Sequence, residues 1–174
     1  MLLTVLTLTH VAISLVGIFS GVVVLSGLLA DKRLDGWTAL FLVTTVLTSV
    51  TGFFFPVHHF MPSHAVGIIS LLVLALAIYA RYKRGLTGAW RKTYVAAAVA
   101  ALYFNVFVAV VQSFLKIPAL KELAPTQTET PFKLTQLVVL LLFVLLGILA
   151  ALLFRSGQGS STPTVPHSET KLQT

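Results

Sequence analysis

Cysteine is absent from this 174-residue chain. Its absence excludes disulfides, thiolate metal sites, haem attached through a Cys-x-x-Cys-His motif, and cysteine nucleophiles. Charge is also scarce, because only 10% of the residues are Asp, Glu, Lys or Arg. No acidic residue lies inside a long apolar run, and this counts against transporters that couple ions through buried carboxylates. The five acidic residues are Asp31, Asp35, Glu122, Glu129 and Glu169.

Recognisable catalytic motifs are lacking as well. The sequence has no paired carboxylates for general acid–base catalysis, no Gly-rich phosphate-binding loop and no His-Glu-x-x-His motif. Serine, histidine and an acid do not converge in any known catalytic pattern. These absences favour a non-enzymatic protein.

Apolar residues, in contrast, make up 57% of the chain, and the mean hydropathy is +0.96. Such values are typical of membrane proteins. Five apolar runs reach the roughly 20 residues that a helix needs to cross a bilayer, and helix is the state that satisfies their backbone groups in lipid. The first run lacks the cationic start of a cleaved signal peptide, so we expect it to remain as a span. The predicted spans are residues 5–30, 37–56, 63–81, 93–115 and 133–154.

The basic residues predict the orientation of this five-helix bundle. With the N-terminus outside, nine Lys and Arg residues lie on the cytoplasmic side and three lie outside, as the positive-inside rule requires. The net charge of +7 is explained in this way, without nucleic-acid binding. We therefore expect a bundle over residues 1–154, with the lipid bilayer as its surroundings. The polar, Gly/Ser/Pro-rich tail over 155–174 is predicted to be disordered and cytoplasmic.

Small and polar residues form a stripe along the first span. His10, Ser14, Gly17 and Gly21 are spaced so that they share one helical face, which we expect to meet another helix closely. The second span has a comparable stripe, which we interpret as a packing surface. Its members are Thr44, Thr48, Thr51 and Gly52.

Polar residues of the spans gather toward the predicted outer side. Polar side chains at membrane depth usually face the protein interior and often mark function. The outer mouth of the bundle is therefore the candidate ligand-binding site, although hydrated interfacial groups would give the same pattern. The candidate residues are His10, Asn105, Gln112 and Gln136.

Histidine offers two further hypotheses. His10 and His64, on different helices at similar depth, are candidate axial ligands of a b-type haem. His58, His59, Met61 and His64 alternatively form an imidazole and thioether set suited to copper.

Four stretches resemble a family of small bacterial inner-membrane proteins without an assigned activity. They are Arg33–Pro56, His64–Ser70, Tyr103–Leu120 and Leu123–Gln127. The resemblance covers residues 10–154 and implies a bacterial cytoplasmic membrane, with no catalytic residues to transfer.

These observations leave three functional interpretations open. The leading one is a non-enzymatic accessory subunit, acting with a membrane partner or a second copy, or a small-ligand binding protein with its polar site on the outer face. The second is a haem or quinone redox protein that uses His10 and His64. The third is a small transporter.

Overall fold

The computed structural model describes residues 1–55 and 62–155. Every regular element in these two ranges is helical, which confirms the all-α prediction for them. The elements are α1 (Leu2–Leu29), α2 (Asp35–Gly52), α3 (Pro62–Ile78), the π-helix η1 (Tyr79–Lys83), α4 (Ala89–Lys116), α5 (Pro118–Leu123) and α6 (Thr130–Leu153).

Four of the described helices are long and apolar enough to cross a membrane: α1, α3 continued by η1, α4 and α6. The shorter helix α2 is not among them. It has the length, but hydroxyl residues such as Thr38, Thr45 and Ser49 make it less apolar, and all three are buried inside the bundle. A helix whose polar face is covered by neighbours needs less apolar surface than one that faces lipid on all sides.

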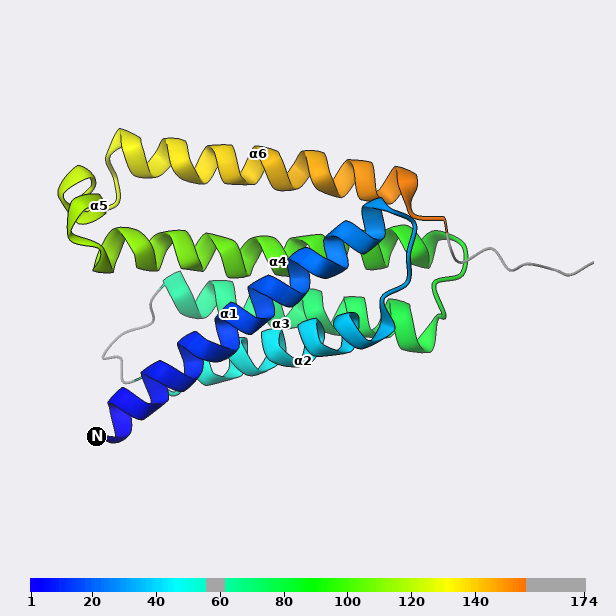
Figure 1. Ribbon diagram of the computed structural model, residues 1–174, viewed down its shortest axis with the longest axis horizontal. Helices are drawn as coiled ribbons and strands as arrows, with labels where there is room; N and C mark the ends of the chain where they lie inside the picture. The colour runs from blue at the N-terminus through cyan, green and yellow to red at the C-terminus, as the bar shows by residue number, and fades with distance from the viewer. Residues whose placement is uncertain (56–61, 156–174) are drawn as a thin grey trace, which may run out of the picture.

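The long helices run side by side, and α1 crosses the others obliquely (Figure 1). Helix α4 is central, because it contacts α1, α3 and α6, whereas α6 contacts mainly α4. The short helix α5 turns the chain between α4 and α6 at the end where α1 begins (Figure 1). The buried apolar core lies toward the opposite end, around Leu28, Phe41, Leu74 and Tyr94.

The two predicted stripes of small residues face each other, as the first stripe was expected to face a helix. Ser14 Oγ lies 3.4 Å from Thr48 Oγ1. A Cβ added to Gly17 would come within 3.3 Å of Thr44 Oγ1. The absence of a side chain at Gly17 therefore lets α1 approach α2 closely, with hydroxyls between them.

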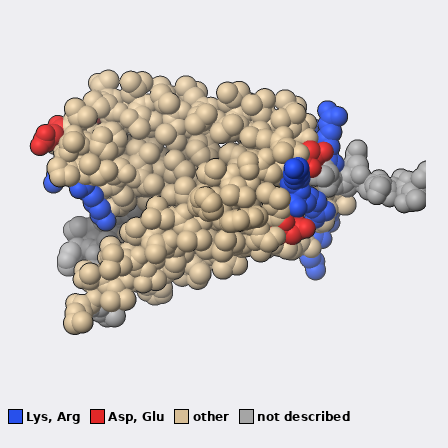
Figure 2. Space-filling model, viewed as in Figure 1, with Lys and Arg blue, Asp and Glu red and all other residues tan. Residues whose placement is uncertain are grey.

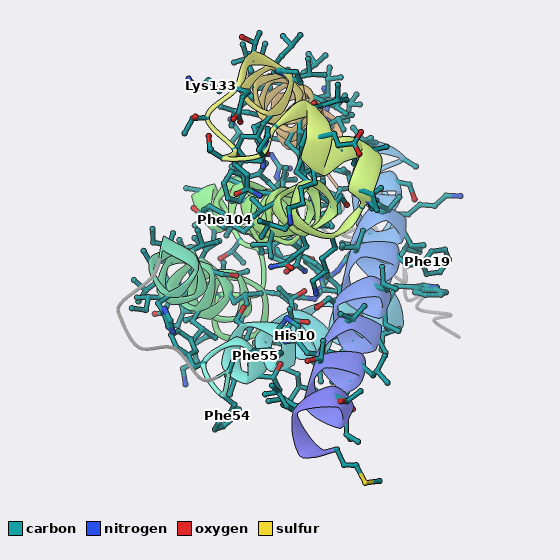
Figure 3. All side chains as sticks on the ribbon, turned by 90° about the vertical axis from the view of Figure 1, so that its left-hand side faces the viewer. His10, Phe19, Phe54, Phe55, Phe104 and Lys133 are labelled. Atoms are coloured by element: carbon teal, nitrogen blue, oxygen red, sulfur yellow. The ribbon has the colours of Figure 1, made fainter. Side chains whose placement is uncertain are left out.

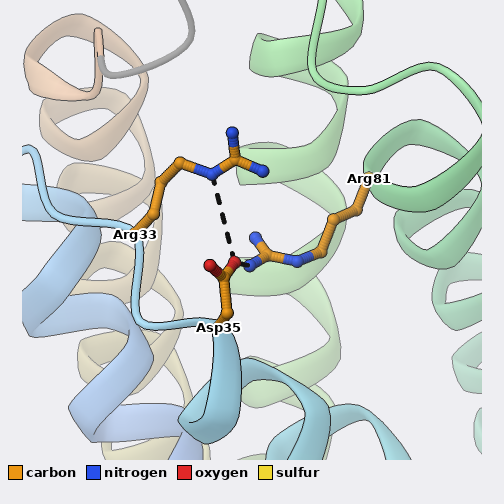
Figure 4. Close-up of polar contacts among 3 residues, drawn as sticks. All are labelled: Arg33, Asp35 and Arg81. Carbon is orange, nitrogen blue, oxygen red and sulfur yellow. Dashed lines mark hydrogen bonds and ion pairs between the residues drawn. The ribbon is translucent and has the colours of Figure 1, made fainter.

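Basic side chains gather at the end of the bundle opposite α5 (Figure 2). One of them, Arg81 of η1, is buried and pairs with the exposed Asp35 at the first residue of α2 (Figure 4). Its guanidinium also lies 5.2 Å from the Tyr94 ring, in a cation–π contact. These contacts fasten the end of α3 and η1 to α2 and α4.

The turn from η1 into α4 depends on glycine. Gly85 and Gly88 have φ values of +58° and +53°, which other residues adopt with strain. Between them Leu86 is 1% exposed and anchors the turn in the core. This tight turn keeps α3 and α4 adjacent and antiparallel.

Two predicted spans end differently in the structure, whereas the other three end within one residue of the prediction. The second helix ends at Gly52 instead of continuing to residue 56, because glycine weakens a helix and Pro56 disfavours helical backbone at Phe55. The third predicted span ends in the π-helix η1, which the apolar pattern did not indicate. The predicted tail is described only to Arg155, and the rest of it lies outside the described residues.

Candidate functional site

An open cavity of about 690 Å³ occupies the half of the bundle where α1 begins. It lies between α1, α2, α3 and α4. The apolar core occupies the other half of the bundle. Figure 3 views this end of the bundle. Polar side chains from all four helices line the cavity among apolar ones. They are Thr7, His10, Ser14, Thr48, Ser49, His64, Ser70, Asn105, Gln112, Ser113 and Lys116.

Asn105 forms the deep end of the cavity. Its Nδ2 donates a hydrogen bond to Thr45 Oγ1 over 3.1 Å, and the residue is 9% exposed. The same Nδ2 lies 3.4 Å from the position that a Cβ on Gly17 would take. Just below, a Cβ on Gly21 would lie 2.6 Å from Leu102 and 2.8 Å from Phe41, so the helices touch there. The cavity therefore ends near the level of Asn105.

His10 points from α1 into the space between the helices, next to Phe55 (Figure 3). Its Nδ1 lies 2.8 Å from Thr51 Oγ1. The Thr51 hydroxyl also lies 2.7 Å from the Leu47 carbonyl, and when it donates its proton there its oxygen accepts from His10 Nδ1–H. This arrangement corresponds to the tautomer whose Nε2 carries a lone pair. Among the described residues no hydrogen bond reaches Nε2, which leaves it able to accept one from a ligand or to bind a metal.

The α3 wall is built by His64, Gly67 and Ser70. The His64 ring lies 5.6 Å from the Phe53 ring, and a Cβ on Gly67 would come within 3.1 Å of the same ring. Ser70 accepts a hydrogen bond of 3.2 Å from Ser49 of α2. Phe53 therefore fills the space beside α3 and narrows the cavity on that side.

One face of α4 runs along the whole cavity. Its lining residues recur at helical spacing, from Phe104 and Asn105 through Ala109 and Gln112 to Lys116. With a rise of 1.5 Å per residue, Phe104 to Lys116 spans about 18 Å. Gln112 and Lys116 are one turn apart and therefore neighbours on this face.

The charge of the cavity has one sign. Among its described lining residues Lys116 is the only one of the Lys, Arg, Asp and Glu type. Lys116 is exposed and, within the described ranges, forms no ion pair. We call the end of the cavity at Lys116, opposite Asn105, its mouth. An anionic group at the mouth would thus meet a cation without displacing a protein carboxylate.

The structure brings together four of the residues singled out from the sequence: His10, His64, Asn105 and Gln112 all line this cavity. Gln136 lies elsewhere, on α6, where its Nε2 donates to the Phe107 carbonyl of α4 over 3.2 Å.

Only one of the four residues in the copper hypothesis is described by the structure. His58, His59 and Met61 lie outside the described residues, so His64 is its one described member. Among the described residues no group of three or more His, Cys, Asp or Glu side chains is arranged to hold a metal ion.

Sequence reasoning missed Lys116, Ser49, Ser70 and the two phenylalanines Phe53 and Phe55. Lys116 had a usable signal, because it follows Gln112 by four residues and so shares its face. The others depend on how α2 and α3 are rotated, which spacing within a single helix does not determine.

Comparison of the chain with protein-family models, curated proteins and solved structures gives no match.

Proposed function

We propose that this protein is an integral membrane protein that holds a small amphipathic ligand in the cavity between α1, α2, α3 and α4. The observation that carries the proposal is the cavity itself. It is large enough for a small molecule, and it combines apolar walls with a few convergent polar groups, as ligand sites do. The described lining residues supply hydrogen-bonding groups such as His10, Asn105 and Gln112. They include no pair of side chains suited to general acid–base catalysis.

The proposed membrane placement has five crossings, with the N-terminus outside and Arg155 inside. Two contacts support counting α2 as a crossing. Its first residue, Asp35, pairs with Arg81 at the basic end, and Thr51 near its other end bonds His10. Helix α2 therefore extends from the basic end of the bundle toward the end where α1 begins, antiparallel to α1. The resemblance noted in the sequence supports a bacterial cytoplasmic membrane, with the cavity opening to the outer side.

The test is to identify what the protein carries. Protein solubilised in mild detergent is extracted with organic solvent, and the extract is analysed by mass spectrometry. We expect a small amphipathic molecule that is enriched over the bulk lipids of the same membrane. The proposal is wrong if wild-type protein shows no such enrichment, even after incubation with a membrane lipid extract.

A cavity-filling variant provides the matched comparison. Ala109→Phe adds a ring to the α4 face of the cavity, whereas Ala12→Phe adds it to an exposed position of α1 outside the lining. We expect Ala109→Phe to lose the enriched molecule and Ala12→Phe to keep it. If Ala109→Phe does not fold, Val11→Phe takes its place, because Val11 lines the cavity and is 41% exposed. Equal retention in the filled and control variants would place the ligand elsewhere.

Haem is the second candidate ligand, because His10 and His64 line the same cavity and the hydrogen bond between His10 and Thr51 is made by Nδ1 and not by Nε2. A hydrogen bond to the other ring nitrogen is how proteins orient imidazole ligands of metals. The optical spectrum of the purified protein, oxidised and then reduced with dithionite, tests this candidate. The absence of a Soret band after haem is supplied during expression rules it out.

The transporter interpretation is less well supported. In the described residues the lining stops near Asn105, and the space below is filled by buried side chains that include Phe41, Leu74 and Leu102. In the accessory-subunit interpretation, a partner would bind the side of α6 that points away from the bundle, whose exposed leucines include Leu137, Leu141 and Leu145. Because lipid covers such an apolar surface equally well, its exposure does not indicate a partner.

A further inference from the structure

We propose that the ligand is an amphiphile with one apolar chain and an anionic head group, whose head group is bound by Lys116 at the cavity mouth. This inference rests on the proposed function, which requires only that the cavity be occupied. It adds the polarity of the ligand, its direction in the cavity and the residue that selects it.

The shape of the cavity favours one extended chain. The cavity is elongated, because its lining follows α4 from Phe104 to Lys116, a length of about 18 Å. An elongated space lined by apolar side chains suits an extended chain better than a compact, branched molecule. Apolar walls accompany the chain along α1 and α4, at Val11, Leu15, Ile18, Phe104 and Val108.

The distribution of polar groups gives the direction. At the deep end the Asn105 amide donates to Thr45, and Ser49 donates to Ser70, so each of these side chains has at least one partner within the protein. At the mouth, Gln112 and Lys116 are exposed neighbours on one face of α4. A head group therefore finds unused hydrogen-bond donors at the mouth, and the chain end lies toward Asn105.

The sign of the charge follows from Lys116. No acidic residue is present among the described lining residues, and Glu122 and Glu129 lie in α5 and in the following loop. An ammonium beside an apolar cavity strengthens the binding of a carboxylate or phosphate through a charge-assisted hydrogen bond. Both head groups can accept such a bond. A carboxylate would come from a free fatty acid, and a phosphate would come from a lysophospholipid.

Binding is measured with tritiated palmitate on protein reconstituted in nanodiscs, with empty nanodiscs subtracted. Competitors of equal chain length are lysophosphatidic acid, which carries a phosphate, and hexadecanol, which is neutral. We expect one of the anionic compounds to bind at least about tenfold more tightly than hexadecanol, a factor that corresponds to 1.4 kcal/mol. Preference for palmitate identifies the carboxylate, and preference for the lysolipid identifies the phosphate.

Lys116→Gln removes the charge, and Lys133→Gln removes a charge from the first turns of α6, outside the cavity lining. We expect Lys116→Gln to lose about tenfold in affinity for the anion and little for hexadecanol. Lys133→Gln should keep both affinities, and Lys116→Arg should keep most of the anion affinity because its charge remains.

The two proposals fail differently. If hexadecanol binds as tightly as the anions and Lys116→Gln changes nothing, this inference is wrong while ligand binding stands. If none of the three compounds binds, and the Ala109→Phe variant has the same solvent extract as wild type, the proposed function is wrong as well. Lys116 at the end of α4 is then explained as an anchor that reaches the membrane surface.

Discussion

The carboxylate of Asp35 has two guanidinium neighbours in very different surroundings. Arg81 has a side chain that is 3% exposed, whereas the Arg33 side chain is 40% exposed and its Nε lies 4.0 Å from Asp35 Oδ1. The Asp35 side chain itself is 74% exposed and stays hydrated. Asp35 is therefore important mainly because it neutralises the buried Arg81, and little because of Arg33.

We predict that Asp35→Asn destabilises the protein by about 1 to 3 kcal/mol, because a buried guanidinium loses its charged partner while keeping a weaker hydrogen bond. Arg33→Gln should cost less than about 1 kcal/mol, as exposed ion pairs do. The measurement is thermal unfolding in detergent, followed by circular dichroism. Equal losses of stability in the two variants would show that the burial of Arg81 does not determine how much Asp35 stabilises the protein.

At the scale of helices, the contact of α1 with α2 and α4 is set by residues that lack side chains. Gly21 faces Leu102 and Phe41, both of which are 1% exposed and have little room to move. Close packing makes such contacts sensitive to one added carbon.

We predict that Gly21→Ala destabilises the bundle by about 1 to 3 kcal/mol, the usual cost of overpacking a core. Gly36→Ala is the matched control, because nothing lies within 4 Å of the Cβ that it adds in the first turn of α2. Helix propensity alone favours alanine at both positions, so only the helix contact can give the two variants opposite signs. The free energy of unfolding, measured by denaturant titration in mixed micelles, provides the comparison.

The helices were the part most accessible from the sequence, because apolar runs of membrane length can satisfy their backbone groups in lipid only as helices. The stripe from His10 to Gly21 also identified the face of α1 that packs, since small residues at helical spacing indicate close contact. The π-helix η1 was not predictable in this way, because an apolar run does not distinguish α-helical from π-helical backbone. The pairing of Arg81 with Asp35 was not predictable either, because periodicity within one helix contains no information about contacts between elements.

The candidate site was accessible to a smaller degree. The depth of His10, His64, Asn105 and Gln112 in their spans grouped them at one end, and one cavity contains all four. Depth could not separate Gln136 from them, because the direction in which α6 turns its polar residue depends on packing against α4. Lys116 was counted only as an outer charge, although its position one turn after Gln112 placed it on the same face.

The whole molecule has two unlike ends (Figure 2). The backbone N–H of Arg155 donates to Asp31 Oδ1 over 2.5 Å, so the chain after α6 returns to the end where α1 finishes. Basic side chains are concentrated at the end where α1 finishes, and three lysines lie at the end where α1 begins. The described basic residues at the end where α1 finishes are Lys32, Arg33, Arg81, Lys83, Arg84, Arg91, Lys92 and Arg155.

We predict that reporters fused at Leu34 and after Arg155 both report the cytoplasm, and that a reporter inserted near Pro125 reports the outside. The reason is the excess of Lys and Arg at the end shared by the first two positions. Paired alkaline phosphatase and green fluorescent protein fusions at each site make the measurement, since the former is active outside and the latter fluoresces inside. An outside signal at Leu34 would remove α2 from the crossings.

The contact of Gly21 with Leu102 and Phe41 closes the cavity at one end and leaves it open at the other. Under the proposed function, a ligand therefore enters and leaves the cavity at the same end. With the proposed orientation, that end faces one leaflet of the bilayer. The bound molecule would then come from that leaflet and be released on the same side.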